Sequence, residues 1–271
     1  MRLADRQLTL WSHLHFYCRF CPDPYNPFNA SNVDKYVVGD DYQPIWLTRL
    51  GKHYSEGYSM KNSFDAYLQS IGKEPETIWT QVDDAIRSVI LDKEPSLIQS
   101  GRRFKKGKFF EMMRFDFVID QDLNVFLMEA NMSPNLSSKH FPPNQQLYEQ
   151  VLFALFSTIG LAYGPMITSE AKVLEITDRQ KMTNAQHCGT SECMGCSDDC
   201  LMCSQCLSEK DGDNIRASIT EHFNRVNTRR VFPPAGKETL KHYDSSGLTA
   251  ANKMLVKWFY HKCVDDPYFC Y

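Results

Sequence analysis

The spacing of apolar residues between positions 51 and 100 predicts two helices. Apolar residues recur there every three or four positions, as at Phe64 and Leu68, and the same rhythm starts again at Ile78. This spacing gathers apolar side chains on one face of a helix. A turn-forming stretch interrupts the rhythm near residues 73–75, so we expect one helix on each side of it.

Two short runs rich in β-branched and aromatic residues predict an antiparallel hairpin. They cover residues 115–119 and 125–131, and the turn-forming residues 120–124 lie between them. Apolar stripes that begin at residue 145 and again within residues 248–263 predict two further helices. We expect the first of these helices to pack on the hairpin and the second to dock on the core.

The composition is that of an ordinary globular protein. The chain has 271 residues, of which 42% are hydrophobic and 23% charged, so it has room for one large domain or two modest ones. A formal net charge of -3 gives no reason to expect nucleic acid as a partner. The longest apolar stretch, residues 151–163, is interrupted and too short to span a bilayer, so no membrane insertion is expected.

The composition and the regularity of the hydrophobic pattern change near residue 164, which predicts that the chain has two parts. Residues 1–164 hold the regular helix and strand patterns, whereas residues 165–271 are polar, less regular and rich in cysteine. We therefore expect an α/β (α+β) fold with an antiparallel sheet and packed helices, followed by a small cysteine-rich extension.

The ends of the predicted hairpin present oxygen-bearing side chains. Asp116 lies early on the first strand, and Glu129 and Asn131 lie two residues apart near the end of the second. Residues two apart on a strand point to the same face. Magnesium prefers oxygen ligands from one or two carboxylates together with phosphate and water, so this pattern is compatible with a magnesium site. Solvated acidic residues beside a turn are the plainer alternative.

The segment that holds these residues resembles a known family. Residues 110–137, with acidic residues in an F-D-F and an E-x-N-x-S-P context, are similar to the last hairpin of the tubulin-tyrosine ligase-like branch of the ATP-grasp fold. The resemblance implies that Asp116, Glu129 and Asn131 bind ATP-bound magnesium in the C-terminal subdomain of such a ligase. It also implies the reaction: ATP phosphorylates a carboxylate, and an amino acid, glutamate or a similar one, attacks the acyl phosphate.

The resemblance implies tubulin, or another glutamate-rich protein tail, as the acceptor and no protein nucleophile, so no catalytic side chain is assigned. A Lys/Arg run precedes the hairpin and could steer acidic tails, and Lys61 is a second candidate for acceptor contact. The candidate acceptor-binding residues in the run are Arg102, Arg103, Lys105 and Lys106. A solvated loop and a plain surface lysine are the alternatives. We expect a monomer.

Two of the departures of the sequence from the family pattern bear directly on the candidate site. The resemblance reaches from about residue 16 to about residue 163, and the family's earlier lobe, with its phosphate-gripping lysine, does not fit before Phe16. Arg114 stands where relatives commonly carry glycine. The chain is therefore predicted to be the C-terminal portion of a ligase domain, either an active ligase or a truncated or inactive relative that binds acidic tails.

Six cysteines within nineteen residues form a second candidate site. They are Cys188, Cys193, Cys196, Cys200, Cys203 and Cys206. C-x-x-C pairs suit structural zinc, with His187 nearby as a possible ligand, but three disulfides or free thiols fit the same residues. Disulfides need an oxidising compartment, and no secretory signal is visible at the start of the chain. The default location is therefore the cytoplasm, beside microtubules or cilia, with a secretory location open if the true N-terminus is missing.

Overall fold

A computed structural model gives the fold of residues 1–4, 7–39, 42–101, 108–162, 181, 183, 185–197 and 200–271. It confirms the mixed α/β class, because helices alternate with short strands and every strand pair in these ranges is antiparallel. Among the helices of these ranges, none is long and apolar enough to cross a membrane.

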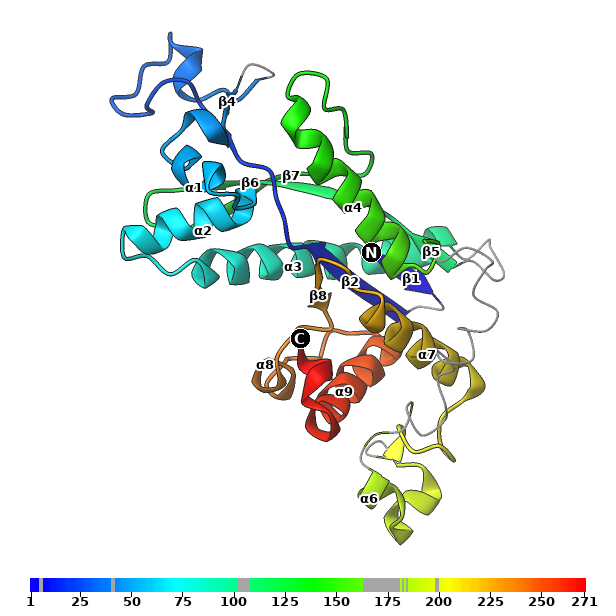
Figure 1. The fold of residues 1–271 in the computed structure, drawn as a ribbon. Coiled ribbons are helices and arrows are strands. Elements are labelled where there is room, and N and C mark those ends of the chain that lie inside the picture. Colours follow the sequence, from blue (N-terminus) through cyan, green and yellow to red (C-terminus); the bar gives the residue numbers. More distant parts are fainter. Residues whose placement is uncertain are drawn as a thin grey trace.

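A four-stranded sheet lies at the centre of the molecule (Figure 1). Its strand order is β5-β1-β2-β8, formed by Lys108–Phe110, Arg2–Ala4, Gln7–His13 and Thr228–Phe232. The strand β8 comes from far along the chain and pairs with β2. The sheet therefore joins the first residues of the chain to its C-terminal third.

A small lobe follows β2 and has its own apolar cluster. It holds the two-residue strands β3 (Arg19–Phe20) and β4 (Gln43–Pro44) and the helices α1 (Gly51–Ser55) and α2 (Met60–Ser70). The helix α2 begins where the Ser59 side chain accepts a hydrogen bond from a backbone N–H of its first turn. Among the residues that the structure describes, the 3-10 helices are η1 Val33–Lys35, η2 Ile45–Leu47, η3 Pro142–Asn144, η4 Ser191–Gly195 and η6 Pro267–Cys270.

The long helix α3 (Glu76–Gly101) supports both the sheet and the predicted hairpin. The pair of helices expected over residues 51–100 is confirmed as α2 and α3, and the short α1 precedes them. On α3, the Gln81 side chain donates to the carbonyl of Leu123 and accepts from the backbone N–H of Val125, at 3.0 and 3.1 Å. This pair of hydrogen bonds fixes the turn end of the hairpin on the helix.

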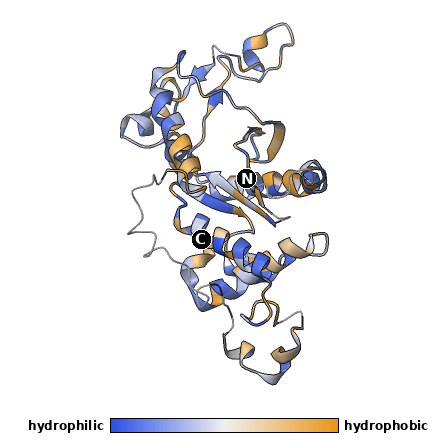
Figure 2. Cartoon of the chain, turned by 90° about the vertical axis from the view of Figure 1, so that its right-hand side faces the viewer, coloured by the Kyte–Doolittle hydropathy of each residue, from blue (hydrophilic) through white to orange (hydrophobic). Residues whose placement is uncertain are grey.

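The C-terminal helices complete the core on the other side of the sheet (Figure 1). They are α7 (Glu209–Phe223), α8 (Lys237–Lys241) and α9 (Ala250–Asp265), and α9 confirms the last helix expected from the sequence. Figure 2 shows hydrophobic positions on the helices beside the central sheet. Buried residues of β1, β2, α3, α7, β8 and α9 belong to one apolar cluster, so elements from both sides of the expected boundary at residue 164 pack together.

Within the described residues two further α-helices remain: α4 (Gln145–Thr158), which confirms the helix expected from residue 145, and α6 (Ala185–Cys188) in the segment that holds the six clustered cysteines. The helix α4 contacts α7, which lies on the other side of the expected boundary at residue 164. The cysteine-rich segment lies at the end of the molecule remote from the hairpin (Figure 1).

Candidate functional site

The predicted hairpin is confirmed as β6 (Arg114–Ile119) and β7 (Val125–Asn131). Asp120 shapes the turn that joins them: its carboxylate accepts hydrogen bonds from the Asn124 side chain and from backbone N–H groups of the turn. The same hydrogen bonds, that from the Asn124 side chain above all, hold the pKa of Asp120 below its usual value.

A β-bulge gives the two faces of the hairpin different characters. The register shifts by one residue between Asp116 and Phe117, which leaves Met128 as the extra residue on β7. Beyond the shift, Ile119 and Val125 still pair on the face that packs against an apolar cluster of α2 and α3. The polar ends of both strands therefore lie together on the opposite, solvent-facing side.

That polar face brings the three predicted metal ligands together, because Asp116 pairs directly with Glu129 across the strands and Asn131 follows two residues later. The Asn131 amide donates to Glu129 Oε1 at 2.9 Å. The side chain of Glu129 is 60% exposed and that of Asp116 is 34% exposed, so the cluster is open to a ligand from solvent.

The ionic partner of these carboxylates is Arg114, a contact that was not predicted from the sequence. Arg114 opens β6, pairs with Asn131 in the register, and lies on the same face as Asp116 because the two residues are two apart. Its Nε and Nη2 donate to the two carboxylate oxygens of Asp116 at 2.7 and 2.9 Å. Its Nη2 also lies 3.8 Å from Glu129 Oε1. Strand alternation was the signal in the sequence that could have identified this contact.

The chemistry of this donor set fits a cation. Asp116, Glu129 and Asn131 offer oxygen atoms only, as a hard divalent ion requires, and the two carboxylates already hold the positive guanidinium of Arg114. These residues therefore fit magnesium by their donor atoms. Arg114 binds the same oxygens that the ion would need.

The predicted acceptor-binding residues lie partly outside the described structure. Arg102, Arg103, Lys105 and Lys106 fall in residues 102–107, which the structure does not describe. Lys61, on α2, forms an ion pair with Asp65 and lies 4.6 Å above the ring of Trp79. The Trp79 indole N–H also donates to Asp65, at 2.9 Å. An acceptor role for these basic residues stays a prediction.

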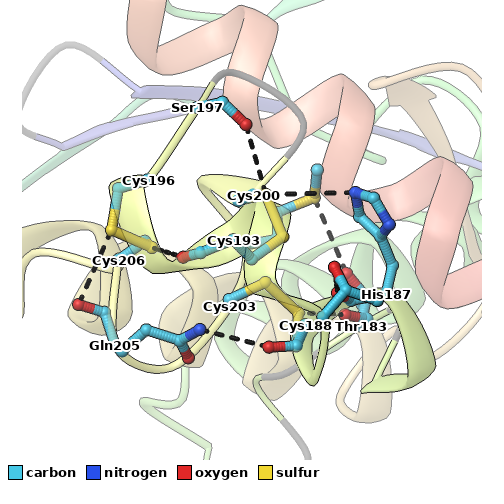
Figure 3. Close-up of a disulfide and its surroundings, with 12 residues drawn as sticks. Thr183, His187, Cys188, Cys193, Cys196, Ser197, Cys200, Cys203, Gln205 and Cys206 are labelled. Atoms are coloured by element: carbon cyan, nitrogen blue, oxygen red, sulfur yellow. Dashed lines mark hydrogen bonds between the residues drawn. A yellow bond between two sulfur atoms is a disulfide. The ribbon is translucent and has the colours of Figure 1, made fainter.

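In the cysteine-rich segment, all six cysteines are paired as disulfides (Figure 3). The pairs are Cys188–Cys203, Cys193–Cys200 and Cys196–Cys206, and a fourth disulfide, Cys263–Cys270, joins α9 to η6. Ligand atoms of His187, Cys193 and Cys200 also lie within 4.8 Å of one another. These three residues could hold a metal once the Cys193–Cys200 disulfide is reduced. Burial raises the pKa of the Cys18 thiol, which is unpaired like that of Cys21.

Comparison with known proteins now decides the family. The model of the tubulin-tyrosine ligase family matches residues 2–167, which is more than half of the chain and includes the whole hairpin. The chain belongs to this family.

Individual members of the family align with more of the chain. The probable tubulin polyglutamylase ttll-15 of Caenorhabditis elegans is 37% identical over 93% of this chain and 50% of its own length. Tubulin polyglutamylase TTLL6 of Mus musculus is 24% identical over 85% of this chain and 28% of its own length. Tubulin polyglutamylase TTLL7 of Homo sapiens is 22% identical over 84% and 28%. The chain thus spans half or less of the length of these relatives, and its similarity to ttll-15 extends past residue 167.

Proposed function

We propose that this chain carries the metal-binding part of an ATP-dependent ligase. The ligase would add glutamate, or a similar amino acid, to tubulin or a related glutamate-rich protein through an acyl phosphate. The observation that carries the proposal is the polar face of the hairpin, where two carboxylates and an amide from paired strands share one surface. The names of the relatives, all tubulin polyglutamylases, support the reaction class.

In this proposal Asp116, Glu129 and Asn131 hold the magnesium ion of ATP. A bound magnesium ion offsets negative charge on the phosphoryl group as it moves. The strands fix the three side chains in register, and the hydrogen bond from Asn131 orients the Glu129 carboxylate. The three side chains are open to solvent and supply metal ligands only, so the proposal requires other residues to bind the rest of the nucleotide.

The acceptor is recognised in this proposal by positive charge. Arg102, Arg103, Lys105 and Lys106 precede β5 in the sequence, and Lys61 lies on α2. Such a cluster attracts strings of glutamates by long-range electrostatics. We propose that the chain acts as a monomer on these tails.

The proposed acceptor and the cysteines point to different locations for the chain. A tubulin acceptor places the chain in the cytoplasm, beside microtubules or cilia. Thiols are normally kept reduced there, whereas the structure has four disulfides. The redox state of these cysteines therefore tests the cytoplasmic location directly.

One observation favours a second candidate function, a catalytically inactive relative that binds acidic protein tails. Arg114 already pairs with Asp116 and lies close to Glu129, so the negative charge on this face is partly balanced without a metal ion. A binding module of this kind would hold glutamate-rich peptides equally well with and without magnesium and nucleotide.

The test is calorimetry of ATP binding to the full chain, with and without magnesium. An active ligase part binds ATP only with magnesium and loses that binding in Glu129→Gln, whereas the control Glu192→Gln, an exposed residue of η4, changes nothing. Incorporation of labelled glutamate into a glutamate-rich tubulin-tail peptide then tests the reaction itself. Peptide binding without any magnesium-dependent ATP binding would favour the second candidate.

A further inference from the structure

Arg114 places a fixed positive charge among the oxygen atoms of the candidate metal site. Its guanidinium binds both oxygens of Asp116, at 2.7 and 2.9 Å, and its Nη2 lies 3.8 Å from Glu129 Oε1. A two-bond contact between a guanidinium and a carboxylate is among the stronger hydrogen-bonded ion pairs and has a specific geometry. The guanidinium therefore binds both oxygens of Asp116 and at the same time lies next to the Glu129 carboxylate.

Arg114 and a divalent ion compete for one position. A magnesium ion shared by Asp116 and Glu129 would lie close to oxygens of both carboxylates, where Nη2 of Arg114 now lies. The two positive charges also repel each other at the few ångströms that separate neighbouring ligands. An arginine guanidinium keeps its positive charge at every physiological pH, so this competitor is always present.

The structure also leaves Arg114 room to move. It is the first residue of β6, and its side chain is 35% exposed. A long side chain at the end of a strand can turn into solvent without disturbing the strand pairing, because its backbone hydrogen bonds do not depend on it. Release of Asp116 and Glu129 to an ion therefore needs a side-chain movement only.

We propose that Arg114 is an internal counter-cation that occupies the metal position of the hairpin and that a divalent ion must displace it to bind. This inference rests on the proposed assignment of Asp116, Glu129 and Asn131 as metal ligands. It adds that this chain has a built-in competitor for its own metal, so its intrinsic affinity for free divalent ions is low. A neutral residue in place of Arg114 restores the affinity of the carboxylates.

The test uses Mn²⁺ alone, added to the full chain, with the free ion measured by electron paramagnetic resonance. Removing a positive charge a few ångströms from the ion tightens Mn²⁺ binding by about tenfold or more in Arg114→Gln. Arg114→Lys keeps the charge, so binding stays within a few-fold of wild type. Arg216→Gln, which removes an exposed arginine on α7, gives the wild-type affinity. Far-UV circular dichroism confirms that each variant is folded.

A double variant separates this inference from the proposed function. Tighter binding in Arg114→Gln that disappears when Glu129→Gln is added supports the displacement of Arg114. Equal binding by wild type and Arg114→Gln, lost in Glu129→Gln, overturns the role of Arg114 and leaves the metal site standing. Tight binding that survives Glu129→Gln overturns the inference, since the ion then binds elsewhere. The absence of Mn²⁺ binding in every folded variant overturns both the inference and the metal site.

Discussion

The side chain of Asn252 links three elements that are far apart in the sequence. It is fully buried on α9, its Oδ1 accepts from the backbone N–H of Leu8 on β2 at 2.9 Å, and its Nδ2 donates to Glu94 on α3 at 2.6 Å. Leu8 and Glu94 are buried as well. We predict that Asn252→Ala strongly destabilises the whole chain, because it removes one partner from each of two buried polar groups.

The magnitude follows from those two groups. A buried polar group left without its partner costs about 1 to 3 kcal/mol, and more when it is charged, so we expect Asn252→Ala to lower the free energy of unfolding by roughly 3 to 5 kcal/mol. That is a large share of the roughly 5 to 15 kcal/mol that stabilises an ordinary folded protein. The replaced side chain also leaves a small cavity that adds to the cost.

The cost should depend on pH through Glu94. Burial raises the pKa of Glu94, and the hydrogen bond from Asn252 partly opposes that rise. A carboxyl with a raised pKa in the folded state binds more protons there than in the unfolded state, so its stabilising contribution is present at acid pH and lost as pH rises through the folded-state pKa. Without Asn252 this loss is larger, so the variant is more strongly destabilised at pH 7 than at pH 4.

The assay is urea unfolding of the full chain at both pH values, followed by tryptophan fluorescence, to which the buried Trp258 on α9 contributes. Lys257→Ala, an exposed change on the same helix, is the control and costs little. Glu94→Gln keeps a neutral acceptor for Asn252 and removes the titration. A cost for Asn252→Ala below about 1 kcal/mol, similar to that of a surface substitution, or one that is equal at pH 4 and pH 7, would refute this reasoning.

Three further predictions concern the cysteines and two buried basic residues. Alkylation of the denatured, unreduced chain should modify two of the ten cysteines, Cys18 and Cys21, and full reduction should expose all ten; ten reactive thiols before reduction, with or without bound zinc, would rule out the disulfides and favour the cytoplasmic location. Burial, with smaller contributions from Arg225 and Arg230, lowers the pKa of His222 to about 3. Stability should therefore be lost as pH falls from about 6.5 toward 3, and thermal melts should show a smaller loss over that range for His222→Phe. Arg230 is fully buried and donates to four backbone carbonyls, of Pro233, Pro234, Phe269 and Cys270. In chemical denaturation Arg230→Met should therefore cost several kcal/mol, at about 1 to 3 kcal/mol for each carbonyl left unpaired. A change under about 1 kcal/mol would mean that these contacts contribute little.

Local sequence patterns were sufficient for four of the helices and for the hairpin. The three-to-four-residue rhythm predicted α2, α3, α4 and α9, because amphipathic spacing is a property of neighbouring residues alone. Alternation and turn residues predicted β6 and β7 in the same way. The short α1 was missed, since five residues are too few to show a period, and the longer α7 in the polar part of the chain was missed as well.

Long-range pairings were not accessible from the same patterns. The strand β8 joins β2 from more than two hundred residues away, and Asn252 contacts Leu8 across a similar distance. The cysteine pattern allowed zinc, disulfides or free thiols, and only three-dimensional proximity selected the pairs.

The candidate site shows the same division. The sequence by itself determined which oxygen-bearing residues share a strand face, because a strand has a period of two. The tertiary structure decided that Asp116 pairs with Glu129, that a bulge follows, and that the guanidinium of Arg114 binds their carboxylates. Register and side-chain partners depend on contacts between segments that are separate in the sequence. A local pattern does not contain those contacts, so it cannot determine them.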